Sequence, residues 1–276
     1  ESKLSGVEHK DFINNIWYHR ELDIPQEWDG KDIMLNFGGV YYNAEIFIDG
    51  NLVGRHFGGS SSFSQDITPY VKPGGKHHLV VHASSDLRSG KQGAGKQNLQ
   101  FASYGCNYTR TTGIWQTVWM EAVSPSGIQS AQVLTDIDQN QIVIMPQFYG
   151  NGGGKLTATL KDGNKTVATA SVPATNSSVI VLPVKKPKLW SPESPFLYDL
   201  QYTVTDAAGN VVDEVNSYVG MRKIHIDGNK IYLNNEPCYQ RLVLDQGFYP
   251  DGIWTAPSDE ALKRDIELSM AAGFNG

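Results

Sequence analysis

The sequence predicts a mainly β protein with two β-sandwiches in succession and the start of a parallel α/β unit at the end. Three observations lead to this prediction. Short segments of alternating apolar and polar residues recur up to about Tyr218. Turn-rich pieces separate them, in a chain of 276 residues with 28 Gly and 13 Pro. A helical apolar pattern occurs near the end, after residue 257.

Residues 1–124 are predicted to form the first sandwich, of the jelly-roll kind. Its expected strands lie in the segments IWYHREL, DIMLNF, AEIFIDG, HHLVVHA and GIWQTVWME. The Asp49-Gly50 pair between Ile48 and Leu52 is a strong signal for a tight hairpin, because both residues tolerate positive φ.

Residues 125–222 are predicted to form a second sandwich, after a hinge in AVSPSG at 122–127. About seven short strands in fewer than 100 residues are typical of an immunoglobulin-like fold. The two cysteines, Cys106 and Cys238, are far apart in sequence, and we expect two buried thiols rather than a disulfide or a metal site.

Residues 223–276 change in character. KIHIDGNKIYL reads as a hairpin, and EPCYQRLVL (236–244) as one more strand. A loop then leads to a helix with Ser258 as N-cap and Gly273 at its end. Leu262, Ile266 and Met270 fall on one helical face, which requires a covering surface. The order strand, loop, helix predicts the opening of a parallel α/β unit.

Composition narrows the function classes. A formal charge of −6 without a basic stripe argues against a nucleic-acid partner, and no apolar run is long enough for membrane insertion. Adjacent His77 and His78 would face opposite sides of a strand and could not chelate one metal. We therefore expect no metal site and no cofactor.

Two stretches resemble ligand-binding motifs but lack residues that those motifs require. GKQGAGKQ (90–97) lacks the final hydroxyl residue and the helix of a phosphate-binding loop, so we expect a mobile surface loop. DIDQN (136–140) begins like a calcium loop but lacks its glycine and its last acidic residue, so we expect a turn between strands.

An aromatic and polar stretch, YGCNYTRTTGIWQTVWME (104–121), is the remaining candidate for binding. Amide, hydroxyl and guanidinium groups beside flat rings suit sugars, which offer hydroxyls and C–H faces. We consider Asn107, Tyr108 and Arg110 as substrate-binding residues. Trp115 and Trp119, in the following strand, are expected to be core residues of one sheet face.

The order of these pieces resembles glycoside hydrolase family 2, which includes β-galactosidases, β-glucuronidases and β-mannosidases. The stretch VYYNAEIFIDGNLVGRHFGGSSSFSQDITPYV is similar to the core of that family's sugar-binding domain, and TGIWQTVWME to the segment that closes it. The segments 189–204 and 219–242 resemble the end of its immunoglobulin-like domain and the start of its catalytic barrel. DEALKRDIELSMAAGFNG resembles the first barrel helix.

The resemblance implies retaining hydrolysis of a β-glycosidic bond by two Glu residues at the ends of the fourth and seventh barrel strands. Asn235-Glu236 precedes the first barrel strand, so it does not match the family's Asn-Glu acid/base. We therefore expect no catalytic residue in this chain and expect it to be a catalytically inactive N-terminal portion.

The resemblance also implies some sugar contacts. In several members an acidic residue six positions before the Gly of the GIW segment contacts the sugar, and the matching residue here is Asn107. An amide keeps the hydrogen bonding but removes the charge. Arg241 matches the family's Arg at the end of the first barrel strand. Asp245 and Gln246 follow in a segment that departs from the family pattern, and we consider both as sugar-facing residues.

The sequence thus predicts the non-catalytic portion of a retaining, β-galactosidase-like exo-β-glycosidase with a carbohydrate as its partner. A stand-alone carbohydrate-binding module and a structural β-sandwich protein remain alternatives. We expect weak or no sugar binding by the chain at the family's site, because the barrel completes that site. The residues identify neither the sugar nor the compartment. A periplasmic or secreted location and a homo-oligomeric parent both stay open.

Overall fold

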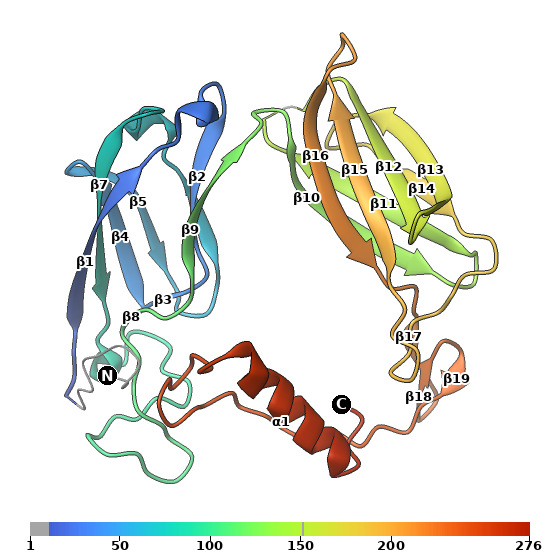
Figure 1. Cartoon of the computed structure of the whole chain (residues 1–276). Helices are drawn as coiled ribbons and strands as arrows, with labels where there is room; N and C mark the ends of the chain where they lie inside the picture. Colours follow the sequence, from blue (N-terminus) through green and yellow to red (C-terminus); the bar gives the residue numbers. More distant parts are fainter. Residues whose placement is uncertain (1–10, 151) are drawn as a thin grey trace. The chain divides into compact units, whose positions relative to one another are not determined.

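The computed structural model describes residues 11–150 and 152–276, which form two compact units (Figure 1). The first unit joins Glu1–Val123 with Val243–Ala272, and the second joins Ser124–Leu242 with Gly273–Gly276. Residues 1–10, the start of the predicted first domain, lie outside the described part. The chain after residue 222 therefore contributes to both units.

The first unit is a β-sandwich with antiparallel sheets in the orders β1-β7-β4-β5, β6-β2-β9 and β3-β8. The strands are β1 (Asn15–Asp23), β2 (Asp32–Phe37), β3 (Val40–Tyr41), β4 (Asn43–Ile48), β5 (Asn51–Phe57), β6 (Phe63–Asp66), β7 (Lys76–Ser84), β8 (Gly113–Ile114) and β9 (Val118–Val123). The predicted jelly-roll architecture is confirmed.

Alternation along the strands builds the core of this unit. Ile46 and Ile48 on β4 face Val81 on β7 and are fully buried, because alternate residues of a strand share one face. The predicted hairpin joins β4 to β5. Asp49 and Gly50 have φ of 48° and 82°, the two positive values that a type I′ turn requires.

The second unit contains an immunoglobulin-like sandwich, as predicted. Its two antiparallel sheets have the orders β10-β11-β14 and β13-β12-β15-β16. The seven strands are β10 (Ile128–Asp136), β11 (Gln141–Phe148), β12 (Lys155–Asp162), β13 (Lys165–Pro173), β14 (Ile180–Pro183), β15 (Tyr198–Thr205) and β16 (Val211–Val219). The predicted turn at DIDQN is confirmed, since Asp136 accepts hydrogen bonds from the backbone N–H groups of Asp138 and Gln139.

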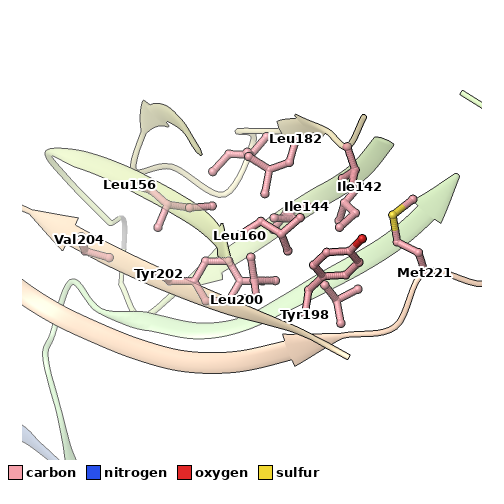
Figure 2. Close-up of a cluster of buried hydrophobic side chains, with 14 of the residues drawn as sticks. Ile142, Ile144, Leu156, Leu160, Leu182, Tyr198, Leu200, Tyr202, Val204 and Met221 are labelled. Carbon is pink, nitrogen blue, oxygen red and sulfur yellow. The ribbon is translucent and has the colours of Figure 1, made fainter. Parts of the chain in front are cut away.

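The core of this sandwich is assembled from both sheets. Figure 2 shows Ile142 and Ile144 of β11 facing Leu160 of β12 and Leu200 of β15, and all four side chains are buried. Tyr202 projects into the same cluster and is only 3% exposed. Among the described residues no group forms a hydrogen bond with its hydroxyl. Burial raises the pKa of this hydroxyl to about 12.

A small sheet follows the second sandwich: β17 (Ile224–Asp227), β18 (Lys230–Leu233) and β19 (Glu236–Pro237). The predicted hairpin is thus present, but the strand predicted over 236–244 is wrong beyond Pro237. Leu242 and Leu244 are 59% and 79% exposed, and no described strand pairs with residues 239–244. A sequence pattern typical of a buried strand is therefore left without the neighbours that would complete a sheet.

Helix α1 (Asp259–Ala271) belongs to the first unit and begins and ends as predicted. The Ser258 side chain accepts a hydrogen bond from the N–H of Ala261 at 3.3 Å, and Gly273 has φ of 91°. The apolar face that includes Ile266 and Met270 remains 62–67% exposed at these residues. No described helix is both long and apolar enough to cross a bilayer.

The expectation of two buried thiols is wrong. Cys106 is exposed and Cys238 is half-buried, and the two are free. Cys106 lies with Gly105 at the tip of a tight turn closed by hydrogen bonds between the backbones of Tyr104 and Asn107. A residue at the tip of such a turn points away from the core, which explains its exposure.

Candidate carbohydrate-binding site

Two loop segments of the first unit, residues 103–112 and 245–258, meet in space. The rings of Tyr108 and Phe248 stack with centroids 3.9 Å apart and planes at 16°. A pocket of about 290 Å³ lies where they meet. Its lining comprises Ser103, Tyr108, Thr109, Phe248, Tyr249, Pro250 and Ile253. Segments that are about 140 positions apart in sequence thus share one small pocket.

A second group of aromatic contacts joins the 245–258 segment to residues of the sandwich. Trp254 packs edge-on against Trp115 at 5.0 Å and against Tyr41 at 5.4 Å. The hydroxyl of Thr255 donates to the carbonyl of Trp115 at 2.8 Å, and the indole N–H of Trp115 donates to the carbonyl of Gly59 at 2.7 Å. These contacts hold the loop on the sandwich. Tyr41, Tyr108, Trp115, Phe248 and Trp254 are called the aromatic cluster below.

Beside the aromatic cluster lies an open groove of about 910 Å³. Indole and phenol rings form one part of its lining, and amide, hydroxyl and carboxylate groups form another. The aromatic lining residues are Trp115, Trp119, Tyr249 and Trp254; the polar ones are Ser62, Gln116, Thr117, Thr255, Ser258 and Asp259. Flat rings next to neutral hydrogen-bonding groups can hold a sugar through its C–H face and its hydroxyls.

The prediction that Trp115 and Trp119 are core residues is wrong. Trp119 is 42% exposed and Trp115 is half-buried, and both line the groove. The alternation of β9 explains the error, because the neighbours Val118 and Met120 pack against the core and place Trp119 on the opposite face. The sequence pattern showed the alternation but not which set of residues faces inward.

Asn107 directly precedes Tyr108, which lines the pocket between the two loops, and is not itself a lining residue. Its backbone exchanges hydrogen bonds with Tyr104, and its side chain is half-buried next to Tyr108. Tyr108 itself presents one ring face to Phe248. Of the residues singled out from the sequence, Tyr108 is therefore placed against the second loop segment, and Asn107 is its neighbour in the chain.

Arg110 occupies a different environment, since it is only 1% exposed. Its guanidinium donates to the carbonyls of Gln100 at 2.6 Å and Asp11 at 3.4 Å, and it lies 4.0 Å from the centre of the Phe12 ring. This arrangement supports the loop from inside. We attribute to Arg110 a part in shaping the loop that carries Asn107.

Two further polar residues build the same loop and were not singled out from the sequence. Gln97 and Asn98 are 2% and 0% exposed. The Gln97 amide accepts from the N–H of Thr111 at 2.7 Å, and the Asn98 amide accepts from the N–H of Gln100 at 2.7 Å. The prediction of a surface loop over 90–97 is therefore wrong at its end, where Gln97 is part of the interior.

The opposite end of the GKQGAGKQ stretch contacts the aromatic cluster. The hydroxyl of Tyr41 donates to the carbonyl of Gly93, and the amide of Gln92 lies 3.4 Å from that hydroxyl. Burial raises the pKa of Tyr41, so the phenol stays neutral. The only sequence signal that this loop packs against the sandwich is its group of amide side chains, namely Gln92, Gln97 and Asn98.

Asp245 and Gln246 are exposed at the start of the second loop segment. The Asp245 carboxylate accepts from the N–H of Gly247 at 2.8 Å. Farther along, the hydroxyl of Tyr249 donates to Asp265 of α1 at 2.9 Å, and this contact raises the pKa of Tyr249. The first of these bonds is internal to the loop, and the second ties the loop to α1.

Arg241 belongs to the second unit. Its guanidinium donates to the carbonyl of Gly273 at 2.8 Å, and its backbone is paired with Asn275. These bonds align the start of the segment after α1 with the segment that precedes the second loop.

No group of three or more His, Cys, Asp or Glu side chains within the described ranges could hold a metal ion. Glu45, Asp49 and Asp138 each have a lowered pKa, first through hydrogen bonds from Arg55, from the N–H of His78 and from Lys223. These carboxylates form structural contacts outside the pockets that the loops line.

Comparison with known proteins identifies related chains. The sequence model of the sugar binding domain of glycosyl hydrolases family 2 matches residues 5–92, and the model of glycosyl hydrolases family 2 matches residues 127–222. The chain is 26% identical over 270 residues to a β-galactosidase of Thermoanaerobacter pseudethanolicus, covering 94% of this chain and 35% of the relative. It is 24% identical over 242 residues to a β-glucuronidase of Paenibacillus borealis, covering 83% and 40%.

A solved structure shows the same fold. The crystal structure of Ruminococcus gnavus β-glucuronidase matches with a TM-score of 0.80 at 22% identity, covering 98% of this chain and 46% of that one. The chain thus spans about a third of the length of the curated relatives it matches, and under half of this structure.

Proposed function

Because the chain belongs to glycosyl hydrolases family 2, whose two models match well over half of it, we propose that it is the non-catalytic, sugar-contacting portion of a retaining exo-β-glycosidase. The observation that carries the proposal is the meeting of two loop segments in one aromatic cluster. Tyr108 stacks on Phe248, and Trp115 packs on Trp254, beside a groove lined by amides and hydroxyls.

The proposed sugar contacts of the first unit are Asn107, Tyr108, Asp245 and Gln246. Tyr108 contacts the second loop segment, Asn107 precedes it in the chain, and Asp245 and Gln246 lie at the exposed start of that segment. Arg241 remains a proposed contact on grounds of its sequence position. Arg110 acts indirectly, by fixing the loop from its interior.

We propose a separate role for each of three consecutive parts of the chain. Residues 1–124 form the sugar-binding jelly roll, residues 125–222 the immunoglobulin-like sandwich, and residues from 223 the start of a catalytic barrel. The hairpin β17–β18 and helix α1, joined by a long loop, are consistent with such a start. The exposed apolar face of α1 fits the inner side of a barrel's outer helical ring.

We propose that the described residues contain no catalytic pair. A retaining glycosidase places two carboxyl groups about 5–5.5 Å apart on either side of the scissile bond. The groove beside the aromatic cluster has one acidic lining residue, Asp259, and the pocket between the loops has none. Two other pockets, one in each unit, also have one each, Asp86 and Asp162.

A neutral sugar is the favoured substrate for this part of the protein. The groove and the pocket between the loops are lined by no Lys or Arg, so they offer no cation for a uronate carboxylate. We propose a β-galactoside as the substrate; relatives carry the names β-galactosidase and β-glucuronidase.

We expect the purified 276-residue chain to release no p-nitrophenol from p-nitrophenyl β-galactoside or β-glucuronide beyond a buffer blank. A β-galactosidase added to the same wells provides the positive control. Turnover by the chain, abolished by replacing one of its own carboxylates, would show that it holds a catalytic pair and would sink the non-catalytic assignment.

A further inference from the structure

The outer face of the sheet β1-β7-β4-β5 carries a fixed aromatic platform. Trp17 on the edge strand β1 is 63% exposed, yet one side of its indole stacks on His82 at 4.1 Å with planes at 15°. His82 is held by Glu45 at 3.1 Å and by Asn15 at 3.0 Å. Arg55 on β5 bonds Glu45 in turn at 2.9 Å. Contacts across four strands therefore set the indole in one orientation.

The Trp17 ring loses little conformational entropy on binding, since His82 already restricts it. β1 is the edge strand of its sheet, so no described strand covers the other side of the ring. A flat, preorganised apolar face is thus offered to solvent.

A polar pocket of about 470 Å³ continues this face toward the end of the sheet. Asn15, Ser84 and Asn43 are register partners on β1, β7 and β4, and all three line the pocket. Each lies two positions along its strand from a residue of the platform, so it projects from the same face as Trp17 and His82. Two positions correspond to about 6.7 Å, comparable with one hexose unit.

The chemistry of this pocket indicates its ligand. Its side chains are mainly amides and hydroxyls, including Asn14, Asn15, Asn43, Ser84, Ser89 and Gln92. One carboxylate, Asp86, and one ammonium, Lys91, leave it without net charge. Amides and hydroxyls match sugar hydroxyls, and the neutral balance gives no preference for an anion.

We propose that Trp17 and the adjoining pocket form a binding surface for a neutral β-linked oligosaccharide, with one sugar ring on the indole and the next among the amides. None of the residues of this pocket lines the groove or the pocket between the loops. The surface would tether the protein to a glycan whether or not the protein hydrolyses it.

Isothermal titration calorimetry of the chain with cellotetraose and with β-1,4-galactotetraose tests this. We expect saturable binding of at least one tetrasaccharide, and about a tenfold loss of affinity in Trp17→Ala, the order of a lost aromatic contact. Asn43→Ala should weaken binding with the platform intact. Tyr218→Ala removes an equally exposed ring (70%) from the second unit and should change nothing.

Three outcomes overturn the proposal: no binding of either tetrasaccharide, binding unchanged in Trp17→Ala, or binding abolished by Trp119→Ala instead. The last would place the sugar in the groove beside the aromatic cluster. Tighter binding of a β-1,4-linked glucuronate tetrasaccharide than of the neutral sugars would contradict the ligand class. Far-UV circular dichroism verifies that each variant is folded. A negative result here leaves the hydrolysis assay unaffected, so the two proposals fail separately.

Discussion

Replacing Arg110 with alanine is expected to lower the free energy of unfolding of the first unit by about 3 kcal/mol. The guanidinium is buried and bonds the carbonyls of Gln100 and Asp11. Without the guanidinium, the two carbonyls lose a charged donor at a buried position. The Phe12 ring also loses the cation that lies over it. Arg110→Lys should recover only part of the lost stability. Its ammonium keeps the positive charge but lacks the planar fork of donors with which the guanidinium reaches both carbonyls.

Urea unfolding followed by tryptophan fluorescence measures the stability change in the first unit. Of the six tryptophans, only Trp190 lies in the second unit. Arg55→Ala is the matched control: its side chain is 67% exposed in an ion pair with Glu45, and its loss should cost less than about 1 kcal/mol. If Arg110→Ala cost no more than this control, the guanidinium would not be supporting the loop.

Alkaline conditions are expected to destabilise the second unit through Tyr202. Its folded-state pKa of about 12 exceeds the value of 10.0 for an exposed tyrosine. The unfolded chain therefore releases this proton first, so the contribution is fully present below pH 10 and is lost as pH rises toward 12. The difference amounts to about 1.4 kcal/mol at pH 11.

Tyr202→Phe isolates this contribution from the other groups that titrate above pH 9. At pH 8 the variant should be as stable as the parent or more stable, because it removes a buried hydroxyl without a described partner. At pH 11 its advantage should be larger by about 1.4 kcal/mol in urea unfolding followed by circular dichroism. An advantage that does not grow between the two pH values would mean that the hydroxyl is hydrated in the folded state.

The strands of both sandwiches could be predicted because their signals are local. Ile46 and Ile48 alternate with polar residues, and Asp49-Gly50 carries the turn geometry in its own backbone preferences. The start and the end of the helix could likewise be predicted, from Ser258 and Gly273. Such features depend on residues within a few positions of each other.

The candidate site could be predicted only in part, because its partners are remote. Arg110 was singled out as a sugar contact, but it bonds a carbonyl 99 positions earlier, at Asp11. The stacking of Tyr108 on Phe248 also joins distant segments. Alternation identified Trp119 as one member of a strand face, but whether that face is inner or outer depends on packing with the rest of the sheet.

The Trp17 platform also depends on contacts between residues that are distant in sequence. IWYHREL indicates a strand with an aromatic residue, but the stacking on His82 depends on the register of β1 with β7. Residues 238–244 show the reverse case. Their composition predicts a strand, but a strand requires backbone partners along its length, and the backbone bonds described for this stretch are only those of Cys238 with Ile231 and of Arg241 with Asn275.

The central claim is that this chain contributes sugar contacts to a β-glycosidase, and the Michaelis constant of the full-length gene product tests it most directly. With p-nitrophenyl β-galactoside, Asn107→Ala should raise KM about tenfold and change kcat less, because a lost hydrogen bond that serves ground and transition states alike weakens binding. Asn107→Asp should retain part of the affinity, since a carboxylate still accepts hydrogen bonds. Asn164→Ala, in the exposed turn between β12 and β13, should leave KM unchanged. A KM in Asn107→Ala equal to that of the parent would contradict a sugar-contacting role and favour a purely structural one for the first unit.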